Sequence, residues 1–259
     1  LERFITRQGD KLYDGEKEFR FIGANMPGLS LPYDYTMKLP ERMTLPTPWE
    51  QADGLKTLDQ MNLRVVRIWN LPIREPHDKP AQGRMTWHYV QGPGRFNEES
   101  FQVLDHLFAL ANRYGIRVVF SLSDCWRYLG GVETYAAHCS RQGKRAFFTD
   151  PQVKEDFQQT IRHVLTRRNT ISGVPYKDDK SILCWELGNE LWDGGREVVR
   201  EEITRVLQAH FRPEFLNRID EIVIFHPLTR RHLSGIVDIQ LRHVIRLLEG
   251  RGIHLEVDQ

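Results

Sequence analysis

The sequence contains little cysteine, and its cysteines do not stand at spacings typical of metal or redox sites. Its 259 residues include three, Cys125, Cys139 and Cys184, which allow at most one disulfide bond. We expect Cys184 to be a reduced thiol within a buried strand, because free cysteine packs as a small hydrophobic residue. CxxC and HExxH patterns are absent, and the ten histidines do not pair at ligand spacing. The sequence therefore predicts neither a metal site nor a cofactor.

An excess of charge of one sign is also lacking. The 36 basic and 35 acidic residues leave a net charge of +1, so composition predicts neither nucleic acid nor an anionic membrane as a partner. The longest apolar runs have the length of strands and are too short to span a bilayer. The first residues, LERF, include no Met and no signal-like apolar segment, and we interpret this start as a processed or trimmed form.

What the sequence does contain is a regular alternation of helix-like and strand-like segments. Turn signals at Gly9-Asp10 and Asp14-Gly15 predict a small hairpin that leads into a strand over residues 19–24. Two long loops are expected over residues 27–49 and 71–97. The expected helices cover residues 51–62, 99–115 and 151–168, and the expected strands cover residues 63–70, 116–124 and 181–187. Such alternation predicts a parallel sheet with helices outside and functional loops at the carboxyl ends of its strands.

Polar and aromatic side chains gather where these predicted strands end. Arg67 and Trp69 end one strand, Asp124 and Trp126 follow the next, and the run SILCWELGNE ends in Asn189 and Glu190. Aromatic rings with a few polar groups suit a sugar, which has apolar ring faces edged with hydroxyl groups. Cleavage of a glycosidic bond requires a proton donor, and a retaining enzyme requires a second carboxylate about 5–5.5 Å away. We predict Glu190 to be the donor and Asn189 to bind a sugar 2-hydroxyl.

The same residues also have purely structural interpretations. Glu190 fits a solvated turn, because Gly188 and Asn189 are good turn residues. Arg67 fits an ion pair inside a barrel, and the tryptophans fit a hydrophobic core. The position at strand ends favours the functional interpretation.

Residues 147–191, FFTDPQVKEDFQQTIRHVLTRRNTISGVPYKDDKSILCWELGNEL, resemble the plant and fungal endo-β-1,4-mannanases of glycoside hydrolase family 5. FRFIGANMPGL, LRVVRIWN and SLSDCWRYLGG are similar to the first, second and third strands of that family. The resemblance covers about residues 1–193 and implies a (β/α)₈ barrel, a β-mannan substrate, a retaining mechanism and a secreted or periplasmic location. It implies Glu190 as general acid/base, Asn189 as sugar-binding amide, Arg67 as the arginine that supports the nucleophile, and Trp126 in the cleft.

The resemblance stops just after the fourth strand. The family's nucleophile is a glutamate on the seventh strand, so the resemblance assigns no nucleophile here. Residues 196–259 instead resemble the second AAA+ module of ClpB-type disaggregase chaperones, through AHFRPEFLNRIDEIVIFHPLTRRHLSGIVDIQL. In that family the arginine corresponding to Arg218 serves the ATP of a neighbouring subunit. A GxxxxGK[ST] loop is missing from the sequence, so we expect no ATP hydrolysis and interpret Arg218 as a surface or helix-capping cation.

We therefore predict an α/β fold in two parts. Residues 1–195 form a partial TIM-type barrel, the first four βα units, and residues 196–259 form a foreign α-β-α-β tail that packs on or completes it. The tail's expected elements are a helix over residues 196–210, a strand over 221–227, a helix over 229–249 and a strand over 252–258. Open strand edges favour a homodimer.

Two classes of function remain open. The first is a mannan-directed hydrolase that takes its second carboxylate from Asp124, Glu221 or a partner chain, or inverts through a water activated about 6.5–9.5 Å from Glu190. The second is a non-catalytic carbohydrate-binding or assembly fragment of a chimeric protein.

Overall fold

A computed structural model describes residues 1–31, 44–78 and 87–191, together with the helical positions 237, 241 and 245. The chain divides into two compact units, Leu1–Ile222 and Val223–Gln259. The three helical positions of the second unit fall within the helix predicted over residues 229–249. The other predicted elements of the tail, Arg218 and Glu221 lie outside the described residues, so the boundary near residue 195 and the chimeric origin stay predictions.

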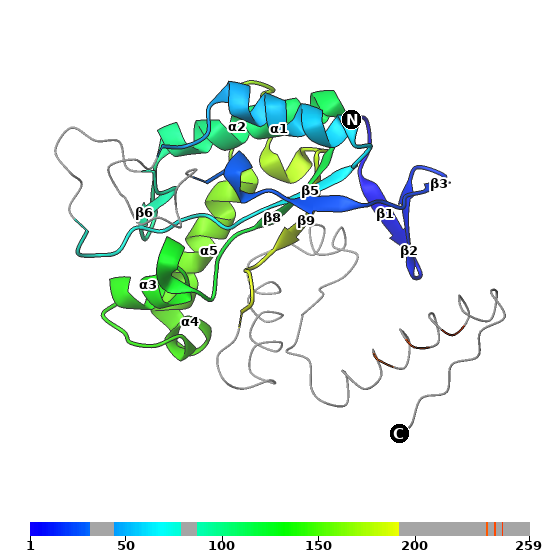
Figure 1. The fold of residues 1–259 in the computed structure, drawn as a ribbon. Coiled ribbons are helices and arrows are strands. Elements are labelled where there is room, and N and C mark those ends of the chain that lie inside the picture. Colours follow the sequence, from blue (N-terminus) through cyan, green and yellow to red (C-terminus); the bar gives the residue numbers. More distant parts are fainter. Residues whose placement is uncertain (32–43, 79–86, 192–236, 238–240, 242–244, 246–259) are drawn as a thin grey trace. The chain divides into compact units, whose positions relative to one another are not determined.

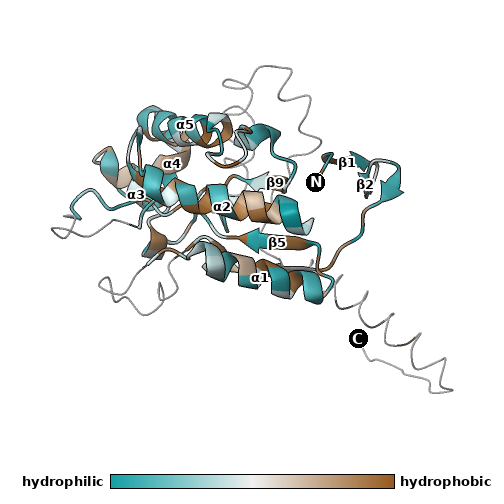
Figure 2. Cartoon of the chain, turned by 90° about the horizontal axis from the view of Figure 1, so that it is seen from above, coloured by the Kyte–Doolittle hydropathy of each residue, from teal (hydrophilic) through white to brown (hydrophobic). Residues whose placement is uncertain are grey.

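A four-stranded parallel sheet forms the centre of the first unit (Figure 1). Its strands lie in the order β4 (Gly23–Asn25), β5 (Val65–Ile68), β8 (Arg117–Ser121) and β9 (Ile182–Glu186). Three helices, α1 (Pro48–Gln60), α2 (Glu98–Tyr114) and α5 (Pro151–Thr166), lie side by side over this sheet (Figure 2). The parallel sheet with helices outside confirms the α/β architecture expected from the alternation of segments.

Shorter elements occupy the segments around this sheet. The N-terminal hairpin of β1 (Ile5–Gln8) and β2 (Lys11–Asp14) is confirmed, and β3 (Lys17–Glu18) extends it to three antiparallel strands. A second antiparallel pair, β6 (Val90–Gly92) with β7 (Arg95–Phe96), lies within the loop predicted over residues 71–97. The remaining elements are the 3₁₀ turns η1 (Pro27–Leu29), η4 (Arg127–Leu129) and η5 (Tyr176–Asp178) and the helices α3 (Val132–His138) and α4 (Arg145–Thr149).

Capping residues set where the long helices begin. Asp150 caps α5 by accepting hydrogen bonds from the backbone nitrogens of Gln152 and Val153, at 2.9 and 3.2 Å, as its position before Pro151 predicted. Helix α1 begins at Pro48, three residues before the predicted start, because Thr47 and Glu50 form a reciprocal capping box.

A buried hydrogen-bond network explains the run LTRRNTISGVPYKDD, which begins in the last turn of α5. The carboxylate of Asp105 on α2 is fully buried, and it accepts hydrogen bonds from Arg167 Nη2 at 2.9 Å and from the hydroxyl groups of Thr170 and Tyr176. Asn169 Nδ2 also donates to the backbone oxygen of Asp105, at 2.9 Å. A buried charge is tolerated when it is paired and hydrogen-bonded, so this run fixes the entry into β9.

The prediction that Cys184 is buried is wrong. The side chain is a free thiol and is exposed. Strand β9 pairs only with β8 among the described strands, so no described strand lies along its other edge. Whether that edge pairs with a second copy of the chain stays a prediction.

Candidate active site

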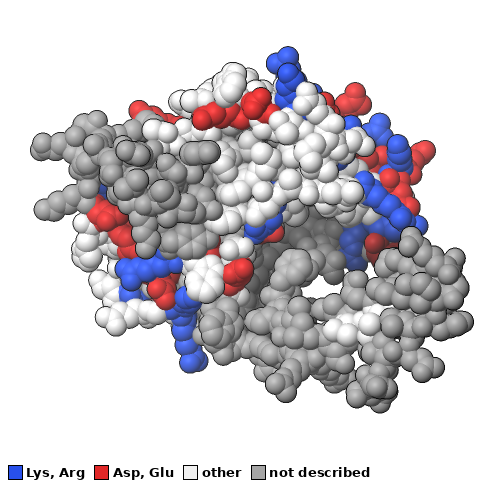
Figure 3. All heavy atoms as spheres, viewed as in Figure 1, with Lys and Arg blue, Asp and Glu red and all other residues white. Residues whose placement is uncertain are grey.

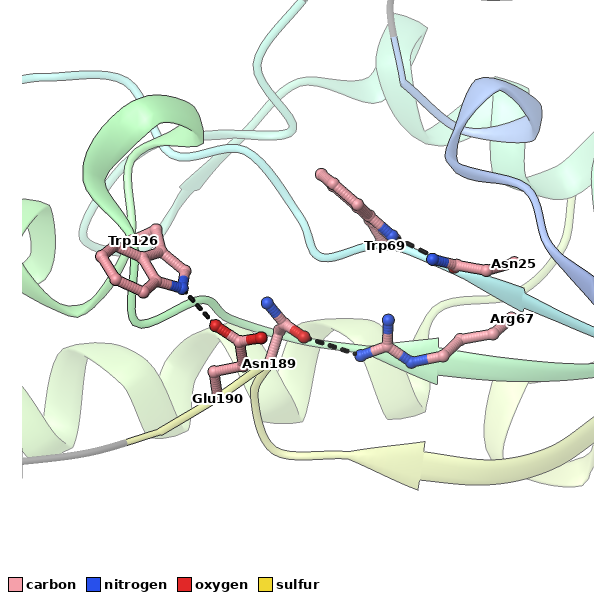
Figure 4. A pocket seen from close by; sticks show the side chains of 6 residues that line it. All are labelled: Asn25, Arg67, Trp69, Trp126, Asn189 and Glu190. Carbon is pink, nitrogen blue, oxygen red and sulfur yellow. Dashed lines mark hydrogen bonds between the residues drawn. The ribbon is translucent and has the colours of Figure 1, made fainter. Parts of the chain in front are cut away.

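Six side chains from the four parallel strands and the loops after them line a pocket of about 310 Å³ (Figure 4). A volume of this size lies at the lower end of the range for small-ligand sites. The lining residues are Asn25, Arg67, Trp69, Trp126, Asn189 and Glu190. The structure therefore brings together five of the six site residues predicted from the sequence. The sixth, Asp124, is fully buried and does not line the pocket.

Glu190 is exposed, and its carboxylate is held from the neighbouring loop. Trp126, which follows β8, donates from its indole Nε1 to Glu190 Oε2. The backbone of Glu190 has a φ of 50°, which is in the left-handed region. A non-glycine residue there costs roughly 1–2 kcal/mol, and such strain is found at functional sites where the surrounding contacts impose it. The backbone at position 190 would favour glycine, but the residue there is Glu190, and its carboxylate faces the pocket.

The amide of Asn189 lies between a cation and a carboxylate. Its Oδ1 accepts from Arg67 Nη2 at 3.1 Å, and its Nδ2 donates to Asp124 Oδ1 at 3.3 Å. Figure 4 shows the oxygen turned toward Arg67 and the nitrogen turned away from it. Residues from three different strand ends therefore meet at this one side chain.

Arg67 is anchored by a carboxylate that the sequence analysis did not assign to the site. Its Nε donates to Glu186 at 3.0 Å and its Nη2 donates to Glu186 Oε2 at 2.7 Å, which makes a bidentate ion pair between β5 and β9. The two side chains are 27% and 24% exposed, so the pair is largely shielded from water. This arrangement fixes the plane of the guanidinium group.

Trp69 stands on the opposite side of the pocket from Trp126. Its Nε1 donates to Asn25 Oδ1 at 3.1 Å, and Asn25 is the last residue of β4. The ring of Trp126 is half exposed, and Lys144 Nζ lies 4.7 Å from its centroid. Two indole rings bordering a small group of polar side chains provide apolar faces and hydrogen-bonding groups together, as a sugar ring requires.

Asp124 lies behind the pocket, in the loop after β8. Its Oδ1 accepts from the backbone nitrogen of Trp126 at 2.9 Å as well as from Asn189. Burial raises the pKa of Asp124, whereas these hydrogen bonds act in the opposite direction. Only glycine fits at position 131, because a Cβ there would come within 2.3 Å of the backbone oxygen of Asp124.

Two residues of the site were missed by the sequence analysis, Glu186 and Asn25. Side chains alternate along a strand, so Glu186 lies on the same face of β9 as Cys184. The signal that could have identified it is a charged residue within an otherwise mostly apolar strand. Asn25 ends the first parallel strand, the position that identified the other site residues. Among the described residues, no group of three His, Cys, Asp or Glu side chains is placed to hold a metal ion.

The described surface of the face drawn in Figure 3 carries charges of both signs, with Lys and Arg beside Asp and Glu. No helix in the described part of the chain has the length and apolarity needed to cross a membrane.

A parallel sheet with outer helices and a pocket at the carboxyl ends of its strands is the arrangement found in α/β enzymes of the barrel type. Residues 2–203 match the model of the glycoside hydrolase family 5 β-mannosidase-like family, and the chain belongs to this family.

Known relatives and solved structures agree with this assignment. Mannan endo-1,4-beta-mannosidase 2 of Oryza sativa is 33% identical over 194 residues, which is 72% of this chain and 39% of that protein. Mannan endo-1,4-beta-mannosidase 1 of the same plant is 40% identical over 119 residues, 40% of this chain and 28% of that protein. The endo-1,4-beta-mannanase of Rhizomucor miehei shares the fold with a TM-score of 0.62 at 20% identity, over 84% of this chain and 58% of that structure. The chain thus spans less than two thirds of the length of these relatives.

Proposed function

We propose that the chain carries the acid/base half of a β-1,4-mannan hydrolase site. In this proposal the Glu190 carboxyl group gives its proton to the glycosidic oxygen as the bond from that oxygen to the sugar carbon breaks. The observation that supports it best is the placement of the Glu190 carboxylate, which faces a pocket between two indole rings and is held there by Trp126. The names of the family's relatives, which are mannan endo-1,4-beta-mannosidases, favour a mannan-type substrate.

Asn189 and Arg67 have supporting roles in this proposal. Asn189 binds a sugar hydroxyl group beside the bond to be cleaved, and Arg67 provides positive charge near the second carboxylate. Trp69 and Trp126 pack against the apolar faces of the sugar rings. A polysaccharide substrate also fits the secreted or periplasmic location expected from the resemblance.

The second carboxylate is not assigned. The side chain of Asp124 has no exposed surface, which argues against an attack on a sugar carbon by this residue. Glu221, the other candidate within the chain, lies outside the described residues. Glu186 is engaged by Arg67 on two sides, so it serves the proposal as the anchor of the arginine.

Hydrolysis measured on two substrates tests the role of Glu190. We expect Glu190→Gln to reduce the release of reducing sugar from β-1,4-mannan by about 10²–10⁴-fold, the usual contribution of a general acid. The loss should be smaller with 4-nitrophenyl β-mannoside, because an acidic phenol leaves without protonation. Glu16→Gln is the matched control, since Glu16 is an exposed carboxylate in the N-terminal hairpin. Unchanged mannan hydrolysis by Glu190→Gln would show that Glu190 is not the acid.

The second candidate is a non-catalytic carbohydrate-binding fragment, favoured by the unassigned nucleophile among the described residues. Calorimetric titration with mannohexaose separates the two functions. Binding by the wild-type chain without any release of shorter sugars supports the binding fragment. Turnover that depends on Glu190 supports the hydrolase, and absence of both binding and turnover refutes the carbohydrate assignment.

A further inference from the structure

The amide of Asn189 has only one orientation that satisfies its neighbours. A side-chain amide has an acceptor oxygen and a donor nitrogen. Arg67 Nη2 is a pure donor 3.1 Å from the oxygen, and Asp124 Oδ1 is an acceptor 3.3 Å from the nitrogen. In the flipped orientation a donor would face the guanidinium and a carbonyl oxygen would face the carboxylate. Arg67 and Asp124 therefore determine together whether the amide of Asn189 presents its oxygen or its nitrogen to the pocket.

Asp124 is well placed to impose this orientation, because it is itself held on several sides. Its side chain is fully buried, and the backbone nitrogen of Trp126 donates to the same Oδ1 at 2.9 Å. Its own backbone oxygen accepts from Val132 at 2.9 Å, next to the glycine that permits this close approach.

Backbone hydrogen bonds also join the loop after β8 to the loop after β9, at the level of Asp124 and Asn189. Asn189 donates to the backbone oxygen of Ser123 at 2.9 Å, and Cys125 donates to the backbone oxygen of Asn189 at 3.0 Å. These two bonds flank Asp124 in the sequence, so Asp124 and Asn189 face one another as in a short parallel bridge. The side-chain contact thus has a fixed backbone frame.

We infer that Asp124 is a positioning residue that locks the Asn189 amide with its nitrogen toward Asp124 and its oxygen toward Arg67, and so sets the hydrogen-bonding group presented to the sugar. The residue acts through Asn189 and does not touch the substrate. This inference deepens the proposed function and rests on it for the kinetic part of its test.

Kinetics of two substitutions at residue 124 test whether its role depends on the hydrogen-bond acceptor that positions Asn189 or on the negative charge of Asp124. Asp124→Asn keeps an oxygen that accepts from both donors, so we expect kcat/KM on mannohexaose to stay within about threefold of wild type. Asp124→Ala removes the acceptor altogether, and we expect a loss of about tenfold, mainly in kcat, since a buried donor left without a partner accounts for a factor of this size. Equal losses in the two variants would overturn the inference. Thermal unfolding of both variants checks that they are folded.

A double-substitution cycle with Asn189→Ala tests whether Asp124 acts through Asn189. If it does, Asp124→Ala causes no further loss of kcat once Asn189 is alanine. A loss of the same size in both backgrounds would mean that Asp124 supports the loop in general, and the inference would be wrong.

A readout without turnover keeps this test separate from the proposed function. The side-chain NH₂ signals of Asn189 in a ¹⁵N–¹H spectrum are assigned by their disappearance in Asn189→Ala. We expect them to shift in Asp124→Ala and to stay near their wild-type positions in Asp124→Asn. Signals that do not respond to Asp124→Ala would overturn the inference even in an active enzyme. The shift in an inactive chain would support the inference while the proposed function fails.

Discussion

The indole nitrogen of Trp126 provides the sharpest test of how the pocket holds Glu190. Trp126→Phe keeps an aromatic face and removes the Nε1–H group that donates to Glu190 Oε2. A hydrogen bond to a charged group contributes about 1.5–3 kcal/mol. Because Trp126 is half exposed, the lower figure applies, and about 1.5 kcal/mol corresponds to a tenfold change in rate.

Steady-state kinetics on mannohexaose measures this effect. We expect Trp126→Phe to lower kcat about tenfold with little change in KM, because the ring that contacts the sugar remains. Trp126→Ala should lower kcat similarly and also raise KM, because it removes the apolar face. Lys144 lies over the ring of Trp126, so Lys144→Met serves as a control that changes the surroundings of the ring without removing the donor.

Two outcomes would refute this reasoning. A kcat for Trp126→Phe equal to that of wild type would mean that the indole donor does not help to hold the carboxylate of Glu190. Identical KM values for Trp126→Phe and Trp126→Ala would mean that the ring does not contact the substrate.

Two further predictions concern the arginine and the acid stability of the fold. Arg67→Lys keeps the charge but cannot hold Glu186 and Asn189 together in one plane. We expect kcat/KM to fall about 100-fold, because about 3 kcal/mol of charge-assisted hydrogen bonding is lost. A fall of less than fivefold would contradict this prediction. Burial, reinforced by Arg74, lowers the pKa of His88 from 6.5 to about 4. The stability that depends on neutral His88 is therefore complete above pH 6.5 and is lost as the pH falls toward 4. Between pH 7 and pH 4.5 we expect the free energy of urea unfolding to drop by about 2.5 kcal/mol more in wild type than in His88→Gln, and equal drops would refute it.

Much of the fold follows from local sequence signals. The helix over residues 99–115 was predictable because its apolar positions repeat at helical spacing and Gly115 ends it with a φ of 68°. The strand over residues 181–187 was predictable from a short, mostly apolar run next to turn residues. The helices α3 and α4 were not predicted, because each is too short for a clear periodic pattern.

The site was predictable only as far as it depends on strand ends. Trp69, Trp126, Asn189 and Glu190 were found because the carboxyl ends of parallel strands meet at one edge of a sheet. Their pairwise contacts were not predictable, since they depend on strand order and on rotamers set by tertiary packing. Glu186 was missed for a related reason, because a carboxylate inside a strand gives a functional signal only when its partner from another strand is known.

The geometry of Arg67 limits where a second carboxylate can act. Its Nε and Nη2 are directed at Glu186 and Asn189, and Nη1 has no hydrogen-bond partner among the described residues. Figure 4 shows this third nitrogen directed toward the side where Trp69 lies. A carboxylate that Arg67 is to support must therefore approach Nη1 from the pocket side. The bidentate bond to Glu186 thereby does more than neutralise the arginine. Among the described residues it leaves Nη1 as the guanidinium nitrogen without a partner, and under the proposed function this is the nitrogen that the second carboxylate would meet.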